Sequence, residues 1–250
     1  MGSRQGGTLK PPPQYPPAPE GYTIYAVGDL HGRSDLLQST HAAIDADDPG
    51  PGSRRKVEIY LGDYIDRGPD AAGVVSRLVA RARVTQAIFL RGNHEQMLLD
   101  FLDGADCFDA WRALGGAATL QSYGVEQRML VRGVASNELR EAFFKKLPEE
   151  HVRFYAETGS YCEIGSYLMV HAGLRPGVKL ANQTTEDLLT VRAAFLQFEG
   201  SFGHIVVHGH TPVAEPDLQP NRINIDTGAF ATNRLTCLRI GEQGASILSP

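Results

Sequence analysis

Five short apolar runs in this 250-residue chain each end in a glycine-containing turn that carries Asp, Asn or His. The turns read GDLHGR (28–33), GDYIDRG (62–68), RGNHE (91–95), HAGL (171–174) and HGHTP (208–212). Short apolar runs bounded by such turns predict buried strands. In open α/β sheets the strand ends face the ligand crevice, so these turns can converge on one site. The chain is therefore expected to be an α/β protein with its chemistry at the strand ends.

The spacing of the apolar residues predicts the order of the elements. Strands are expected at 23–27, 57–61, 87–90, 167–170, 205–207, 222–225 and 235–240. One helix is expected after Gly32, with Ser34 as its cap, and a second over 70–83, where apolar residues recur at helical spacing. Residues 97–155 look mostly helical, with a break at the glycine pair 115–116. This order predicts mixed sheets with a helical insertion.

The first twenty residues differ in composition from the rest of the chain. They are rich in Pro and Gly and have little to bury, so residues 1–20 are expected to be a disordered tail. The segment 46–55 is expected to be a surface loop for the same reason. Residues 21–250 are long enough to bury a core of their own and are expected to form one catalytic domain.

Composition excludes several classes of partner. A net charge of −5 argues against a general nucleic-acid binder. No apolar stretch is long enough for a membrane span, and the N-terminus lacks the apolar core of a signal peptide. The three cysteines are scattered and outside any metal-binding spacing, which is typical of a reducing compartment. We therefore expect a cytoplasmic protein with no nucleic-acid or membrane partner.

The side chains in the five turns are typical of a catalytic metal centre. The possible ligands are carboxylate, amide and imidazole groups, with no thiolate: Asp29, His31, Asp63, Asn93, His171 and His210. This set suits Mn, Fe or Zn in a catalytic site better than a closed structural zinc site. Six ligands are too many for one metal that keeps an open position. They suit two metals about 3.5–4 Å apart that share a carboxylate.

Charged side chains beside these ligands are suited to a phosphate group. Arg67 and Arg91 carry planar guanidinium groups that match phosphate oxygens, whereas Arg33 is interpreted as a surface residue at the start of a helix. His94 is adjacent to a possible ligand and could protonate a leaving alkoxide. Asp66 could hold the imidazole in the required tautomer.

Three of these turns carry the resemblance to a known family. The chain resembles the metal-dependent serine/threonine protein phosphatases of the phosphoprotein phosphatase family. Among them it resembles the bacterial members most. That family reads Gly-Asp-x-His-Gly, then Gly-Asp-x-x-Asp-Arg-Gly, then Gly-Asn-His-Glu, and this sequence matches all three at 28–32, 62–68 and 92–95. The match continues through HAGL and GHTP and spans residues 22–240.

The resemblance implies a calcineurin-like fold, a central β-sandwich of mixed sheets flanked by helices. It also implies that Asp29, His31 and Asp63 bind one metal, and that Asp63 bridges to a second. The second metal would be completed by Asn93, His171 and His210. Manganese is the expected metal, with Fe or Zn as alternatives.

The resemblance further assigns the groups that act on the phosphate. Arg67 and Arg91 would bind it together with Arg192, and His94 would be the general acid paired with Asp66. The expected activity is therefore removal of phosphate from phosphoserine or phosphothreonine in proteins, or from another phosphomonoester.

Two alternatives stay open. One is symmetrical dinucleoside-tetraphosphate hydrolysis, the activity of a sister branch that tends to have Asp where this chain has Glu95, and to lack an acid at the Asp66 position. The other is a non-catalytic phosphoprotein-binding protein, which would need a broken metal or acid position. A nuclease is disfavoured because Pro212 stands where many nucleases of the superfamily have a further histidine ligand.

Other polar residues near the motifs are interpreted as structural. Glu95 is expected to fix its turn through hydrogen bonds, and Asp226 to be a buried carboxylate behind the site. His208 is expected beside the ligands rather than among them, and Trp111 in the core of the insertion. His41, His151 and His204 are expected to be ordinary surface or loop residues. The insertion over 97–155 is expected to form the substrate groove.

Overall fold

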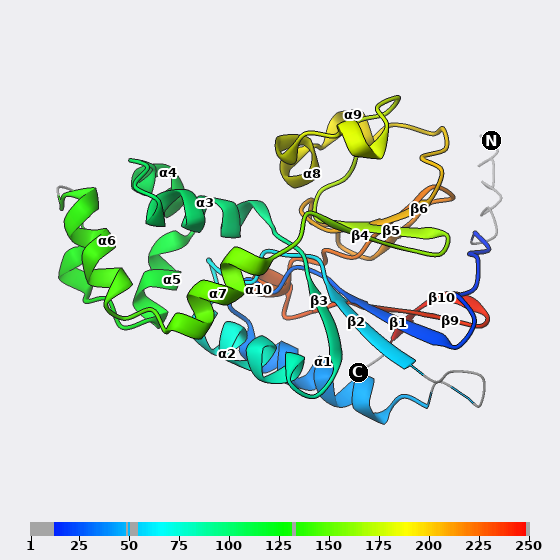
Figure 1. The fold of residues 1–250 in the computed structure, drawn as a ribbon, viewed down its shortest axis with the longest axis horizontal. Helices are drawn as coiled ribbons and strands as arrows, with labels where there is room; N and C mark the ends of the chain where they lie inside the picture. The colour runs from blue at the N-terminus through cyan, green and yellow to red at the C-terminus, as the bar shows by residue number, and fades with distance from the viewer. Residues whose placement is uncertain (1–12, 49, 51–54, 132–133, 249–250) are drawn as a thin grey trace, which may run out of the picture.

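The computed structural model describes residues 13–48, 50, 55–131 and 134–248, and over these the chain forms two five-stranded sheets packed between layers of helices (Figure 1). The first sheet consists, in spatial order, of β10 (Gly244–Leu248), β9 (Cys237–Gly241), β1 (Tyr22–Val27), β2 (Arg55–Tyr60) and β3 (Gln86–Phe89). The second consists of β4 (Tyr161–Ile164), β5 (Tyr167–Val170), β6 (Ile205–His208), β8 (Arg222–Asn224) and β7 (Asp217–Leu218).

Helices lie around these sheets. They are α1 (Ser34–Ala46), α2 (Ala71–Ala82), α3 (Asn93–Leu102), α4 (Phe108–Ala113), α5 (Gly116–Ser122), α6 (Ser136–Phe144), α7 (Glu149–Glu157), α8 (Thr185–Thr190), α9 (Ala193–Leu196) and α10 (Ala229–Thr232). Short 3-10 turns lie at Gln127–Met129 and Leu180–Asn182. Helices α1 and α2 cover the outer face of the first sheet, and α8 and α9 cover the second (Figure 1).

Alternation along the strands explains the sandwich. Ile24 and Ala26 of β1 are buried between the sheets, whereas Tyr25 and Val27 belong to the core formed with α1 and α2. Because successive side chains of a strand point to opposite faces, a strand buried on both faces is apolar throughout. This is why the runs that end in the polar turns are continuously apolar.

Both sheets are mixed, as the sequence predicts. Strands β1, β2 and β3 are parallel, while β9 runs antiparallel to β1. In the second sheet β5, β6 and β8 are parallel, and β4 runs antiparallel to β5. Because parallel strands end at the same edge of a sheet, the turns after β1, β2 and β3 lie side by side. The fold thus brings the motif turns to one end of the sandwich.

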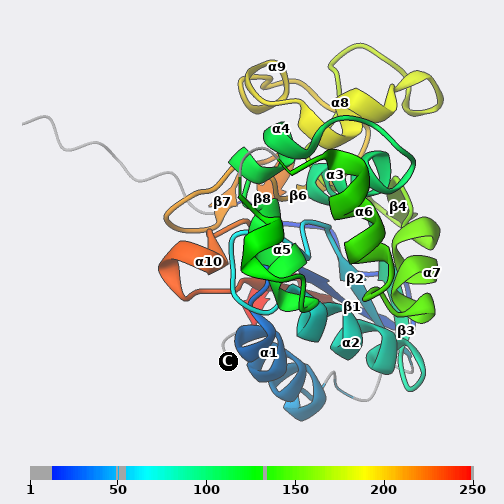
Figure 2. The same ribbon diagram turned by 90° about the vertical axis from the view of Figure 1, so that its left-hand side faces the viewer.

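Helices α3–α7 form a helical lobe at that end, seen at the left of Figure 1 and toward the viewer in Figure 2. The prediction of a mostly helical segment over 97–155 is confirmed for the described part of it. The lobe has an aromatic core that includes Phe101, Trp111 and Phe143. A cavity of about 570 Å³ opens in the lobe, lined by residues that include Phe108, Arg112 and Val131.

Residues 13–20 extend the packed structure upstream of β1. The backbone N–H of Ala18 donates to the carbonyl of Gly241 at 2.9 Å, and the Tyr167 hydroxyl donates to the carbonyl of Pro16 at 2.5 Å. Tyr15 and Ala18 also pack against the core between the sheets. The sequence prediction of a disordered tail is therefore corrected for residues 13–20, and residues 1–12 lie outside the described residues.

Several predicted element ends shift. Ser34 does not cap α1: Arg33 occupies the cap position, and the Ser34 hydroxyl bonds to Asp70 instead. The expected loop 46–55 is shorter, because Ala46 belongs to α1 and Arg55 begins β2; residues 49 and 51–54 lie outside the described residues. Strands β4, β7 and β10 were not predicted. Among the described helices, none is long and apolar enough to cross a membrane.

Candidate active site

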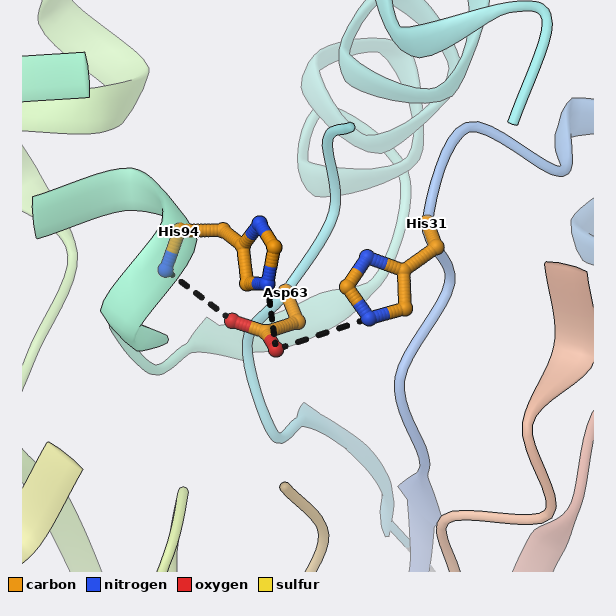
Figure 3. Close-up of side chains that lie close together, drawn as sticks. All are labelled: His31, Asp63 and His94. Carbon is orange, nitrogen blue, oxygen red and sulfur yellow. Dashed lines mark hydrogen bonds and ion pairs between the residues drawn. The ribbon is translucent and has the colours of Figure 1, made fainter. Parts of the chain in front are cut away.

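The turns that follow the strands place two groups of buried side chains in which a metal ion could be held. One group is His31, Asp63 and His94, drawn in Figure 3, and the other is Asp63, His171 and His210. In each group one potential ligand atom per residue lies within 4.8 Å of the others. Asp63 belongs to both groups, so its carboxylate lies between them.

The two oxygens of the Asp63 carboxylate face different groups of ligands. Its Oδ2 lies 3.6 Å from Nε2 of His31, and its Oδ1 lies 3.4 Å from Nε2 of His171. The amide oxygen of Asn93 lies 2.9 Å from Nδ1 of His210 and 3.1 Å from Nε2 of His171. The arrangement offers a bridging carboxylate flanked by two sets of oxygen and imidazole ligands, which is consistent with a dinuclear metal site.

Backbone carbonyls orient two of the imidazoles. His31 Nδ1 lies 2.8 Å from the carbonyl of Ile65, and His171 Nδ1 lies 2.9 Å from the carbonyl of Leu61. A carbonyl only accepts, so Nδ1 carries the proton in both rings and Nε2 presents its lone pair. Such a hydrogen bond on the far nitrogen is typical of metal-binding histidines.

Two buried polar atoms support the fit to divalent cations. Asp29 Oδ1 and His210 Nε2 have no hydrogen-bond partner among the described residues. Burial, together with the nearby Asp226 and Asp63 carboxylates, raises the pKa of Asp29 well above its usual range. Burial lowers the pKa of His210 to about 3, so its imidazole is neutral. Several buried carboxylates beside neutral imidazoles form a site whose negative charge a divalent cation would balance.

Asp29 and His94 are placed differently with respect to these two groups. Asp29 belongs to neither group, and its Oδ2 accepts the backbone N–H of His210 at 3.0 Å. His94, expected as a proton donor, lies in the first group, with Nε2 3.7 Å from Asp63 Oδ2. The backbone N–H of His94 also donates to Asp63 Oδ1 at 3.2 Å (Figure 3).

The backbone of the site adopts conformations that L-residues rarely take. Non-glycine residues with positive φ in the motif turns are His31, Asp63, Asp66, Arg67 and His210. A residue held in this region costs about 1–3 kcal/mol, and such residues concentrate at functional sites. A strand fixes the start of each of these turns: β1 precedes His31, β2 precedes Asp63, and β6 precedes His210.

Glu95 fixes the turn between β2 and the site, as expected from the sequence. Its carboxylate accepts the backbone N–H groups of Asp63 and Tyr64, both at 2.8 Å, and that of Gly92 at 2.9 Å. Gly92 leaves the room that this requires, because a β-carbon there would lie 2.1 Å from Asp63 Oδ1. One buried carboxylate thus ties the second motif turn to the third.

His94 and Asp66 form a buried pair. Nδ1 of His94 lies 2.6 Å from Oδ2 of Asp66, and both side chains are buried. Burial alone lowers the pKa of His94, but the Asp63 and Asp66 carboxylates outweigh it and raise that pKa to about 9. On the other side of the ring, Nε2 lies 3.3 Å from the guanidinium of Arg67.

The three predicted phosphate-binding arginines have different partners in the structure. Arg67 is exposed beside His94, and Arg192 lies with its guanidinium 3.5 Å from the carbonyl of His210. Arg91 is directed elsewhere: it donates to Thr158 Oγ1 at 3.0 Å, to Gln96 at 3.1 Å, and to the carbonyls of residues 156 and 158. In this structure the donors of Arg91 hold the chain after α7, and its expected role in binding phosphate stays a prediction.

Phe230 of α10 is a site neighbour that the sequence reasoning missed. Its ring centre lies 5.4 Å from that of His31, and the Arg67 guanidinium lies 4.8 Å above the ring. The side chain is 37% exposed. An apolar residue in an unpredicted helix gives no sequence signal for such a position.

Other expectations about nearby residues have mixed outcomes. His208 is buried against Phe195 and belongs to neither candidate metal group, and Asp226 is buried as expected. His151, expected at the surface, is buried in the lobe, where Nδ1 lies 2.8 Å from the Tyr123 hydroxyl. Arg33 is also largely covered, because it bonds to the carbonyl of Ala229 in α10.

The two-sheet fold with buried His/Asp groups at its strand ends defines a metal-dependent phosphoesterase. Residues 22–237 match the model of the calcineurin-like phosphoesterases, and the chain belongs to this family.

Curated relatives match over most of the chain. It is 28% identical over 239 residues to the asymmetrical bis(5′-nucleosyl)-tetraphosphatase PrpE of Bacillus subtilis, with 86% of this chain and 90% of that protein covered. The protein of the same name from Anoxybacillus flavithermus is 24% identical, with 86% and 89% covered.

Solved structures with this fold include proteins of different described activity. One, provisionally described as a diadenosine tetraphosphatase, superposes with a TM-score of 0.59 at 18% identity, covering 90% of this chain and 92% of the other. A protein serine/threonine phosphatase from Saccharomyces cerevisiae gives a TM-score of 0.53 at 13% identity, covering 91% and 79%. At these identities the likeness concerns the fold alone.

Proposed function

We propose that this chain is a phosphoric monoester hydrolase that removes phosphate from phosphoserine and phosphothreonine in proteins. The observation that carries the proposal is the buried His94–Asp66 pair. Nδ1 of His94 lies 2.6 Å from Oδ2 of Asp66, and Nε2 of the same ring lies beside the Arg67 guanidinium. Asp66 accepts from Nδ1, so the pair fixes the tautomer and orientation of a proton donor.

The chemistry of the leaving group determines whether the reaction needs such a proton donor. Serine and threonine phosphates release an alkoxide, a poor leaving group unless it is protonated as the bond breaks. General acid catalysis of such a step contributes about 10²–10⁴-fold in rate. A nucleotide leaving group is a stabilised phosphate anion and needs little protonation. The pair therefore favours alkyl phosphomonoesters over polyphosphates.

The resemblance assigns the residues that would hold two divalent ions, with manganese as the first choice. One ion would be held by Asp29, His31 and Asp63, and the other by Asp63, Asn93, His171 and His210. Such ions, when bound, lower the pKa of a water molecule and offset the charge of the phosphoryl group. The chain prepares these positions through the carbonyls behind His31 and His171, and through Glu95 behind Asp63.

Two arginines, Arg67 and Arg192, are placed to orient the phosphate. Arg67 lies beside His94, and Arg192 lies beside His210, so their guanidinium groups flank the two candidate metal groups. A guanidinium forms paired hydrogen bonds to phosphate oxygens and keeps its charge at any working pH. We assign Arg67 and Arg192 to substrate binding and leave Arg91 out of it.

A second candidate is supported by the curated relatives. They are described as asymmetrical dinucleoside tetraphosphatases, and they match this chain over most of both lengths. This candidate differs from the symmetrical hydrolase considered from sequence, because it releases a nucleoside triphosphate and a monophosphate rather than two diphosphates. A non-catalytic binding role has no support, since the ligand and acid positions are all intact.

A substrate panel separates these candidates. We expect the manganese-loaded protein to release phosphate from phosphoserine and phosphothreonine peptides faster than it cleaves diadenosine tetraphosphate. The Asp63→Asn variant should lose orders of magnitude on every substrate while its circular dichroism is unchanged. Faster cleavage of the dinucleotide than of the peptides would overturn the proposal, and its products would identify the symmetrical or asymmetrical reaction. Near-wild-type turnover by Asp63→Asn would remove the metal mechanism.

A further inference from the structure

The Asp66 carboxylate that holds His94 is itself held by two side chains of the helical lobe. The indole N–H of Trp111, in α4, donates to Asp66 Oδ2 at 2.8 Å. The hydroxyl of Thr119, in α5, donates to Asp66 Oδ1 at 2.5 Å and accepts the backbone N–H of Asp66 at 2.8 Å. All four side chains are buried. A segment that looked like a core or recognition insertion therefore reaches the acid–base pair.

These contacts settle the direction of each hydrogen bond. An indole N–H can only donate, so Asp66 Oδ2 is an acceptor at this contact. Thr119 Oγ1 accepts from the Asp66 backbone, which leaves its own proton for Oδ1. With both oxygens used as acceptors, Nδ1 of His94 is the third donor. Nε2 then remains the ring atom that faces Arg67 and the site.

Packing prevents the indole from shifting away from Asp66. The centre of its ring lies 5.3 Å from that of Phe101, and Gly116 also lies against the indole. A β-carbon at Gly116 would lie 2.6 Å from the indole, closer than carbon atoms approach. The glycine pair that marks a helix break in the sequence therefore also brings α5 against Trp111.

We propose that Trp111 and Thr119 are positioning residues for protonation of the leaving group. They fix the plane of the Asp66 carboxylate, and through it the direction in which His94 presents its Nε2 proton. The inference rests on the proposed function of His94 as proton donor. The helical lobe, and not the motif turns alone, then sets how well that proton is delivered.

The step balances as an ordinary ester hydrolysis. A water oxygen forms the new bond to phosphorus and loses a proton to solvent. The ester P–O bond breaks with its electron pair on the leaving oxygen, which takes the proton from His94 Nε2. His94 then regains a proton from solvent, while Asp66 keeps its hydrogen bonds to Nδ1 of His94, Trp111 and Thr119 throughout.

The test uses the dependence of turnover on the leaving group. Trp111→Phe keeps an aromatic ring, although a smaller one, and removes the N–H. Thr119→Val keeps the shape of the side chain and removes the hydroxyl. On 4-nitrophenyl phosphate, whose leaving group needs little protonation, we expect kcat to fall at most a few-fold. On phenyl phosphate and a phosphoserine peptide we expect kcat to fall about tenfold or more, a part of the 10²–10⁴ that a general acid supplies. KM should be unchanged.

Two comparisons separate positioning from general damage. Tyr123→Phe is the matched control, because its hydroxyl lies in the same buried lobe but bonds to His151 and Tyr155 rather than to Asp66. It should keep the wild-type leaving-group dependence. In a His94→Asn background, Trp111→Phe should have no further effect on that dependence, because the two residues act through one pathway.

A spectroscopic readout does not depend on activity. Trp111 is the sole tryptophan of the chain, so its indole N–H gives one NMR signal. We expect this signal to exchange slowly with solvent and to shift in Asp66→Asn but not in Tyr123→Phe.

The inference is overturned if both lobe variants slow all substrates by the same factor, or if the indole signal is insensitive to Asp66→Asn. If the wild type and His94→Asn share one leaving-group dependence, the proposed function of His94 fails first, and the inference fails with it.

Discussion

Replacement of Gly92 by alanine tests whether the site depends on where the Asp63 carboxylate lies. Gly92 has φ −94° and ψ 170°, a conformation that alanine adopts freely, so the substitution adds only a methyl group. That methyl group would lie 2.1 Å from Asp63 Oδ1 and 2.4 Å from the Asp63 backbone nitrogen. Ordinary contacts of a β-carbon are 3.4–4 Å, so Asp63 must move by more than 1 Å.

The size of the effect follows from this displacement. Overpacking a buried site costs about 1–3 kcal/mol of stability. For a chain of this length that lowers Tm by about 2–4 °C per kcal/mol. A displacement of about 1 Å at a catalytic group can cost about 10²-fold in rate. We expect Gly92→Ala to stay folded, with Tm lowered by several degrees and kcat for 4-nitrophenyl phosphate lowered about 100-fold.

Gly159→Ala is the matched control. It lies at the same end of the sheet, where its N–H donates to Phe89, but the nearest atoms to an added β-carbon are 3.9 Å away. Its Tm, its kcat and its bound manganese should equal those of the wild type. Wild-type kcat in Gly92→Ala would refute the reasoning, because it would mean that the Asp63 carboxylate can move without consequence.

Three further predictions concern metal, arginine roles and pH. Chelation should lower both Tm and turnover, because the buried carboxylates of the site lose their counter-charge, and added manganese should restore both. A Tm that does not respond to the chelator would contradict this. Arg67→Lys should raise KM about tenfold, because paired hydrogen bonds to phosphate are lost. Arg91→Lys should instead lower Tm and leave KM unchanged. The reverse pattern would show that Arg91, and not Arg67, binds the phosphate. Burial and the nearby Arg81 lower the pKa of His41 to about 4. As the pH is lowered through 6.5, His41 takes up a proton in the unfolded chain, but in the folded chain it does so only near pH 4. The free energy of unfolding therefore falls as the pH is lowered from 6.5 to about 4. Urea titrations at pH 7 and 4.5 should show a smaller loss for His41→Gln than for the wild type; equal losses would exclude this role.

The motif turns were the most predictable part of the molecule. Each follows a buried strand, and parallel strands end at one edge of a sheet, so His171 and His210, which follow β5 and β6, lie close together. Asp63 follows β2 of the other sheet and meets them because the two sheets pack with these strand ends at the same end of the sandwich. Glu95 was also predictable in role, because a buried carboxylate at the start of a helix finds backbone N–H groups.

What the sequence could not supply was the direction of long side chains. Arg91 stands at the end of a strand beside the site, yet its donors find closer acceptors at Thr158 and Gln96. Trp111 was correctly expected in a core, but its N–H needs a partner, and that partner lies 45 positions away in the chain. Tyr15 and Ala18 pack against the sheets from a segment whose composition alone suggests disorder. Each of these contacts depends on tertiary approach rather than on local pattern.

The most direct test of the account is the ratio of two rates in the His94→Asn variant. The wild type and the variant, loaded with manganese, would be assayed on a phosphoserine peptide and on diadenosine tetraphosphate. If His94 donates a proton to an alkoxide, turnover of the peptide should fall about 10²–10⁴-fold while turnover of the dinucleotide falls far less. An equal fall on both substrates would contradict the central claim that His94 and Asp66 serve a phosphomonoester leaving group.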